Sequence, residues 1–150
     1  MSQSEVKKKI NPVDIYDDLD RTSVTGPLRQ AQEEVLQEWF LNYKDKKNLV
    51  VKLHTGAGKT LIGLLMLQSK LNEGEAPCIY VCPNKYLMNH VCYEATKFGI
   101  PVCTIGGNNI IPRDFSEGKM ILITYVHKLF NGKTIFGIGN NYEDAGCIVI

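Results

Sequence analysis

The chain has 150 residues, of which 44% are hydrophobic and 22% are charged, and its formal net charge is +1. This length allows one domain at most and is enough to bury a hydrophobic core. No apolar run approaches the ~20 residues that span a bilayer, and the first residues are polar, unlike a signal peptide. We therefore expect a cytoplasmic protein without a membrane partner, while the near-neutral charge argues neither for nor against a nucleic-acid partner.

The first 25 residues are polar and charged, and we expect an N-terminal arm that is partly mobile. Within this arm Val13, Tyr16 and Leu19 recur at helical spacing and predict a short helix that docks on the domain. The domain itself is predicted to cover residues 26–150. Its first helix should begin after Gly26-Pro27, where apolar residues return every three or four positions, and should end in the basic stretch 44–48.

The next feature is the stretch Leu53-His54-Thr55-Gly56-Ala57-Gly58-Lys59-Thr60, which lies between the apolar runs 49–51 and 61–67. This order predicts a buried strand, a tight glycine loop and a helix, which is the layout of a phosphate-binding P-loop. Gly56 and Gly58 let backbone N–H groups surround a phosphate chain, and the helix N-terminus adds its dipole. Lys59 can then reach the β- and γ-phosphates of a nucleotide, and the Thr60 hydroxyl is placed to ligate Mg²⁺. The alternative is a glycine-rich turn whose lysine is solvated. The agreement of the apolar run before the loop, the loop sequence and the helix after it favours the P-loop.

Further strands are predicted after the P-loop helix. Apolar runs at 78–82, 102–105, 120–123 and 147–150 indicate strands, a helix runs from Pro83 to about Gly99, and residues 108–119 indicate a loop. The alternation predicts an α/β fold: a mostly parallel sheet with helices on both faces and the P-loop at the carboxyl end of the first strand.

The five cysteines are an odd number and contain no Cys-x-x-Cys pair: Cys78, Cys82, Cys92, Cys103 and Cys147. Three of them lie in apolar runs typical of strands, where a reduced cysteine packs as a small hydrophobe. A metal site formed by Cys82, His90 and Cys92 is the alternative, and it is less favoured than ordinary packing.

The pair Arg29-x-x-Gln32 ahead of a Thr-Gly-Ala-Gly-Lys-Thr loop is similar to the Q motif and motif I of superfamily 2 helicases of the DEAD/DEAH type. Leu53 replaces the first glycine of the usual P-loop, which fits the helicase variant of the motif. The resemblance covers about residues 26–150 and implies a RecA-like P-loop NTPase domain that uses ATP and Mg²⁺. In that family the glutamine amide reads the adenine edge, whereas Gln32 taken alone would be an ordinary surface residue. The implied ATP-binding residues are Arg29, Gln32, Thr55, Gly56, Ala57, Gly58, Lys59 and Thr60, with Lys59 and Thr60 as catalytic residues.

Three strand ends look like the nucleic-acid-binding motifs of the same family. Pro83-x-x-x-Leu87 is similar to motif Ia, Gly106-Gly107 matches a glycine pair, and Thr124 before a short helix looks like motif Ib. The carboxyl ends of parallel strands share one edge of a sheet, so these loops should lie along one edge. The resemblance implies backbone contacts to a single strand from Pro83, Asn84, Lys85, Gly106, Gly107, Thr124 and Lys128. Two plainer alternatives stay open: Pro83 simply starts a helix, and Tyr125 packs in the core instead of stacking on a base.

The last strand stands where the family carries its Walker B strand, and the acidic residues of that motif would follow Ile150. The resemblance implies a fragment truncated at this strand that hydrolyses ATP poorly by itself. The expected parent couples ATP hydrolysis to movement on nucleic acid, and its second RecA-like domain supplies the arginine finger. Likeness to bacterial helicases of defence, restriction or repair favours DNA over RNA and allows a protein partner in a larger complex.

Two other classes of function remain in competition. A nucleotide-switched scaffold would keep the P-loop and move no strand, but it would not need three loops that grip a nucleic-acid backbone. The third hypothesis is that these residues act only as a non-catalytic interaction fragment.

Overall fold

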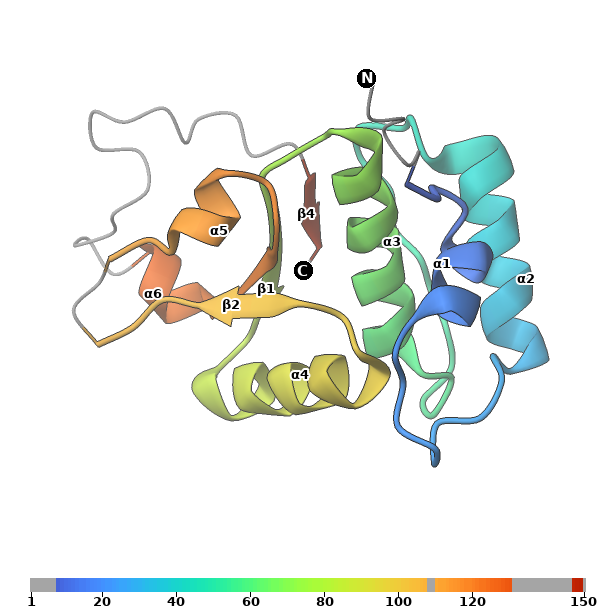
Figure 1. Cartoon of the computed structure of the whole chain (residues 1–150), viewed down its shortest axis with the longest axis horizontal. Helices are drawn as coiled ribbons and strands as arrows, with labels where there is room; N and C mark the ends of the chain where they lie inside the picture. The colour runs from blue at the N-terminus through green and yellow to red at the C-terminus, as the bar shows by residue number, and fades with distance from the viewer. Residues whose placement is uncertain (1–7, 108–109, 131–146, 150) are drawn as a thin grey trace, which may run out of the picture.

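The computed structural model describes residues 8–107, 110–130 and 147–149, and Figure 1 shows their arrangement. The described chain is α/β, as predicted, and none of its helices has the length and apolarity needed to cross a bilayer. The elements in chain order are α1 (Pro12–Asp18), α2 (Gln30–Glu38), the π-helix η1 (Trp39–Tyr43), α3 (Lys59–Glu73), β1 (Cys78–Cys82), α4 (Lys85–Phe98), β2 (Val102–Thr104), α5 (Arg113–Ser116), β3 (Ile121–Tyr125), α6 (Val126–Phe130) and β4 (Cys147–Val149).

The described strands form one sheet of four in the order β2-β3-β1-β4, and every pair is parallel. In the centre Tyr80 of β1 lies beside Ile123 of β3 and Val149 of β4. Parallel strands need long crossover connections, which α4 provides between β1 and β2 and which α5 with its loops provides between β2 and β3. The predicted strands at 78–82, 102–105, 120–123 and 147–150 are therefore confirmed within one or two residues at their ends.

Two hydrophobic clusters cover the two faces of this sheet. On one face α3 and α4 pack on β1 and β3 around Cys78, Cys82 and Ile123. Successive side chains of a strand point to opposite faces, so Ile79 of β1 and Leu122 of β3 lie on the other face. There they pack with the fully buried ring of Phe115. Phe115 belongs to α5, so the prediction of a structureless loop over 108–119 was wrong where this four-residue helix lies.

The segment before the P-loop differs from the prediction. Residues 49–51 were expected to form a buried strand, but the backbone there is irregular and pairs with no described strand. The side chain of Val50 is 92% exposed, and Leu49 and Val51 are exposed as well. A strand needs a hydrogen-bonding neighbour as well as apolar side chains, and no described strand pairs with this segment. The P-loop consequently begins from irregular backbone, and only Leu53 packs on the core.

The predicted short helix in the arm is confirmed as α1, which packs on α3 and α2. Asn11 caps its first turn by accepting a hydrogen bond from the Val13 backbone N–H. The side chains of Ile15 and Tyr16 are almost fully buried in the same cluster as α3 and α4. Helix α1 thus anchors the arm to the hydrophobic core through these two side chains.

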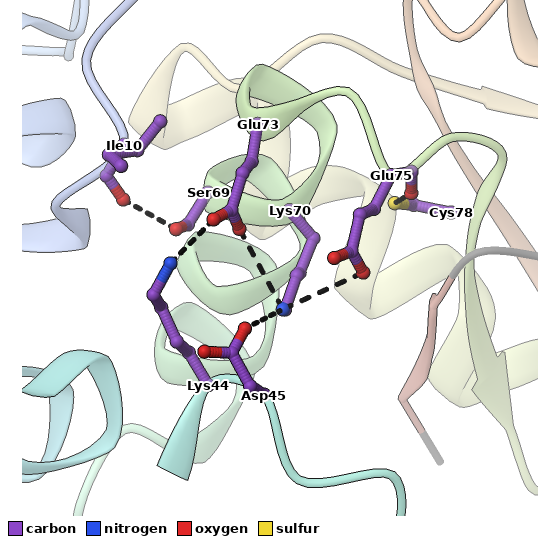
Figure 2. A network of polar contacts seen from close by, with 8 residues as sticks. All are labelled: Ile10, Lys44, Asp45, Ser69, Lys70, Glu73, Glu75 and Cys78. Atoms are coloured by element: carbon purple, nitrogen blue, oxygen red, sulfur yellow. Dashed lines mark hydrogen bonds and ion pairs between the residues drawn. The ribbon is translucent and has the colours of Figure 1, made fainter. Parts of the chain in front are cut away.

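A group of charged side chains joins the end of η1 to the end of α3 (Figure 2). The Lys70 side chain is only 7% exposed, and its Nζ lies 3.6–3.8 Å from carboxylate oxygens of Asp45, Glu73 and Glu75. Lys44 also pairs with Glu73, and this ion pair lowers the pKa of the Glu73 carboxyl below its usual value. A buried ammonium is tolerated because three carboxylates surround it, although two of them remain largely exposed.

We expect Lys70→Ala to reduce the free energy of unfolding by about 1–3 kcal/mol, because it removes both a buried aliphatic stem and the charge. Lys70→Met keeps the stem, so it should recover most of that loss. Urea unfolding of the two variants measures the difference. As a control, Lys9→Met breaks the exposed pair between Lys9 and Asp18 and should leave the free energy of unfolding nearly unchanged. A loss for Lys70→Ala no larger than that for Lys9→Met, or a loss for Lys70→Met as large as that for Lys70→Ala, would contradict this assignment.

Candidate functional site

The P-loop joins irregular backbone to α3 through two glycines with left-handed φ angles. Gly56 has φ +87° and Gly58 has φ +76°, a region where other residues are strained. The Ala57 N–H donates to the His54 carbonyl, which tightens the turn. Gly58 is the N-cap of α3, so Lys59 and Thr60 stand in the first helical turn, as predicted. The free N–H groups of this turn and the helix dipole give the loop an affinity for anions.

The side chains of Arg29 and Gln32 reach the P-loop directly. Arg29 Nη1 donates to the Gly56 carbonyl over 2.6 Å, and Gln32 Nε2 donates to the Gly58 carbonyl over 3.4 Å. Gln32 Oε1 in turn accepts from the Arg29 backbone N–H over 3.1 Å, and the whole residue is only 6% exposed. A side chain at position 58 would overlap the Gln32 amide and displace it from this contact, and the left-handed backbone angle there also favours glycine.

The Gln32 amide keeps capacity for a further ligand in spite of these contacts. An amide oxygen has two lone pairs and an amide nitrogen has two N–H groups, and the protein uses one of each. One donor and one acceptor therefore remain on the same planar group. That pairing matches the edge of a nucleobase that presents a donor beside an acceptor.

A cavity of about 450 Å³ lies against Arg29, Gln32 and the P-loop. Residues from α4 and from the arm complete its walls, and the sequence analysis did not predict this role for any of them, because no local pattern shows which segments pack beside the P-loop. They are Tyr16, Val24, Thr25 and Pro27 from the arm side, and His90, Glu94, Lys97 and Phe98 from α4. Lys97 and His90 both face the Glu94 carboxylate, so charges on the α4 wall are already paired. Both the volume and the mixture of apolar and polar walls suit a nucleoside.

The predicted Mg²⁺ ligand Thr60 is half-buried, and its hydroxyl lies beside the phenol of Tyr80 on β1. Burial raises the pKa of that phenol, and the Thr60 hydroxyl forms a side-chain hydrogen bond with it. A hydroxyl oxygen has two lone pairs, so at least one stays available for a cation. No group of three His, Cys, Asp or Glu that could hold a metal occurs in the described part of the chain. Since Mg²⁺ binds with nucleotide phosphates and several waters, one hydroxyl is a fitting protein ligand here.

The cysteines behave as core residues. Burial raises the pKa of Cys82 and of Cys103 to about 11 and also raises the pKa of Cys92. No group of three His, Cys, Asp or Glu residues placed to hold a metal occurs among the described residues, which include Cys82, His90 and Cys92. The structure thus favours packing over the alternative metal site at these three residues.

The predicted nucleic-acid residues follow strands whose carboxyl ends share one edge of the sheet. Pro83, Asn84 and Lys85 are exposed at the end of β1, and Gly106 and Gly107 are exposed beyond β2. Lys128 is half-buried in α6, directly after β3. Figure 1 shows the start of α4, the arrowhead of β2 and α6 on the left, while the cavity lies at the other end of α4. Helix α4 is 14 residues long, about 21 Å, and it carries predicted strand contacts at its start and cavity residues from His90 to Phe98.

Two of these residues differ in detail from the prediction. Asn84, not Pro83, is the N-cap of α4: its side-chain oxygen accepts from the Leu87 backbone N–H over 2.9 Å. Thr124 is only 1% exposed, because strand alternation turns its side chain to the buried α5 face. The predicted phosphate contact of the Thr124 hydroxyl therefore does not fit this structure. Tyr125 packs on the core cluster, as the plainer alternative for this residue expected.

Comparison with protein families gives one match: the DEAD/DEAH box helicase model matches residues 29–150, which is most of the chain. Its first matched residue is Arg29, so the arm and the Tyr16 wall of the cavity lie outside the matched region. Comparisons with curated proteins and with solved structures gave no match.

Proposed function

This chain belongs to the DEAD/DEAH box helicase family, and we propose that it is the ATP-binding part of a motor that moves along or unwinds DNA. Membership of this family indicates ATP-dependent helicase activity on nucleic acid. The observation that carries the proposal is the hydrogen-bonded contact of Arg29 and Gln32 with the two P-loop glycines beside a nucleoside-sized cavity. This contact places the Gln32 amide, proposed to bind the base, beside the loop proposed to bind the phosphates.

In this proposal the P-loop holds the triphosphate through the backbone around Thr55, Gly56, Ala57 and Gly58. Lys59 is exposed on the first turn of α3 and neutralises charge on the terminal phosphates, while the Thr60 hydroxyl holds Mg²⁺. The bound Mg²⁺ would supply charge neutralisation between the β- and γ-phosphates. Gln32 presents its spare donor and acceptor to the base, and Arg29 holds the loop in place.

The nucleic-acid strand is proposed to lie across the carboxyl edge of the sheet. Pro83, Asn84, Lys85, Gly106, Gly107 and Lys128 would contact its backbone, with the amides at the start of α4 as the main donors. The choice of DNA over RNA rests on family likeness, and a second RecA-like domain, a protein partner and a cytoplasmic location remain parts of the proposal.

Steady-state ATP hydrolysis by the full-length protein tests this function. It is measured without polymer, with single-stranded DNA, with duplex DNA and with RNA. We expect single-stranded DNA to stimulate hydrolysis most strongly. Stimulation by RNA alone would overturn the choice of DNA, and indifference to all polymers would replace the motor by a nucleotide-switched scaffold.

A Gln32→Ala variant should bind ATP about 5–20-fold more weakly, because one donor and one acceptor to the base are lost. Binding of GTP should change less, so the preference for ATP should fall. Calorimetric titration with both nucleotides measures this. Gln30→Ala is the matched control on the same helix, since Gln30 pairs only with the exposed Glu34 in the described contacts. An unchanged ratio of ATP to GTP affinity in Gln32→Ala would remove Gln32 from base recognition.

A further inference from the structure

The loop between α1 and α2 forms one wall of the nucleotide cavity, although it precedes the region matched to the family. Val24, Thr25 and Pro27 line the cavity from this loop. Gly26 between them has a left-handed φ of +62°, and a side chain there would meet no other atom within 4 Å. The loop itself is therefore open on that side, and its position must be set by other contacts.

Two side chains from the arm converge on a single backbone atom of this loop. Arg21 Nη1 donates to the Gly26 carbonyl over 2.6 Å, and the Tyr16 hydroxyl donates to the same oxygen over 2.7 Å. Arg21 Nη1 also lies 3.1 Å from the Thr25 hydroxyl, which donates to the Thr22 carbonyl. These contacts hold both Thr25 and the peptide bond that precedes Pro27.

The Arg21 side chain is itself fixed. Its guanidinium carbon lies 4.0 Å from the centre of the buried Tyr16 ring, and that ring packs against Phe98 of α4. The backbone N–H of Thr22 donates to the Lys97 carbonyl at the end of the same helix. Arg21 Nε is buried without a hydrogen-bond partner in the described residues, a desolvation cost that stability alone does not favour.

We propose that Arg21 is a positioning residue for the base of the bound nucleotide. By holding the Gly26 carbonyl, Arg21 fixes the cavity wall formed by Thr25 and Pro27. The same loop leads within two residues to Arg29, whose side chain bonds the Gly56 carbonyl of the P-loop. Arg21 does not line the cavity, so it acts on the nucleotide only through this loop. The inference rests on the proposed ATP binding, and it places a determinant of base affinity outside the matched helicase region.

The test compares ATP with inorganic tripolyphosphate, which carries the phosphates but no base. Arg21→Met should weaken ATP binding by up to about tenfold, because the loop loses its charge-assisted hydrogen bond to Arg21 and must then be ordered when the base binds. Tripolyphosphate has no base, so its binding should stay within about twofold. Arg21→Lys retains one donor and should restore part of the ATP affinity. Tyr16→Phe keeps the ring and removes the second hydrogen bond to Gly26, so it should shift ATP binding in the same direction even if Arg21→Met folds poorly.

The control variant is Lys9→Met, which breaks an exposed ion pair on the same arm and should leave both affinities unchanged. An equal loss of ATP and tripolyphosphate in Arg21→Met and Tyr16→Phe would assign the arm a merely structural role and overturn the inference. Unchanged ATP affinity in both variants would overturn it as well. A wild-type protein that binds neither ligand would instead refute the proposed function.

Discussion

Lys59→Ala is expected to weaken ATP binding by about 10–100-fold, because the ammonium makes charge-assisted contacts to phosphate worth about 1.5–3 kcal/mol. The side chain is exposed on the first turn of α3, and no ion pair holds it in the described part of the chain. Its removal should therefore leave the thermal unfolding temperature within about 2 °C of the wild type. Calorimetric titration with Mg·ATP and a thermal melt measure the two effects.

The matched control is Lys52→Ala, which removes another exposed lysine, seven residues before Lys59 and directly before the P-loop. It should leave ATP affinity nearly unchanged, since long-range attraction between exposed charges is largely screened at physiological salt. Equal losses for the two variants would mean that Lys59 acts only through net charge. Full ATP affinity in Lys59→Ala would show that the glycine loop is not a phosphate site.

Gly99→Ala should lower the free energy of unfolding by about 2–5 kcal/mol. Gly99 ends α4 with a left-handed φ of +74°, which strains any residue with a side chain by about 1–2 kcal/mol. The new methyl group would also overlap the backbone carbonyl of Asp20 in the arm, and such overpacking adds about 1–3 kcal/mol. Urea unfolding of the variant measures the sum.

Gly74→Ala separates the two contributions. Gly74 ends α3 in the same left-handed conformation, with φ +94°, but a side chain there would meet nothing within 4 Å. It should lose only the strain of about 1–2 kcal/mol. If Gly99→Ala is no more destabilised than Gly74→Ala, the arm does not pack against the end of α4 in solution.

The parts of the fold that the sequence predicts best are those specified by local patterns. The helix after the P-loop begins at Lys59 and ends at Gly74, and strand β1 falls on the apolar run 78–82, because helical periodicity, glycine caps and β-rich runs act over a few residues. The failure at residues 49–51 has a physical reason. An apolar run indicates burial, but a strand also depends on a neighbour whose identity no local pattern reveals.

In the candidate site, too, local sequence patterns predict some of the residues and not others. The P-loop and the Arg29-x-x-Gln32 pair are visible in the sequence because their spacing is fixed by chemistry, and the structure brings them into hydrogen-bonding contact. The α4 side of the cavity could not be predicted from the sequence. Lys97 and Phe98 approach the P-loop only because α4 packs on one face of the sheet. Thr124 was predicted as a contact residue but is buried. Its position at a strand end does not indicate which face of the sheet its side chain takes.

The central claim is that ATP binds between the P-loop and the Arg29–Gln32 pair, and amide hydrogen exchange with and without Mg·ATP tests it most directly. We predict slower exchange in the nucleotide complex for the amides of residues 55–62 and 29–33, with little change at the start of α4 or in α6. Protection that appears only at the carboxyl edge of the sheet, or none at saturating ATP, would contradict the account.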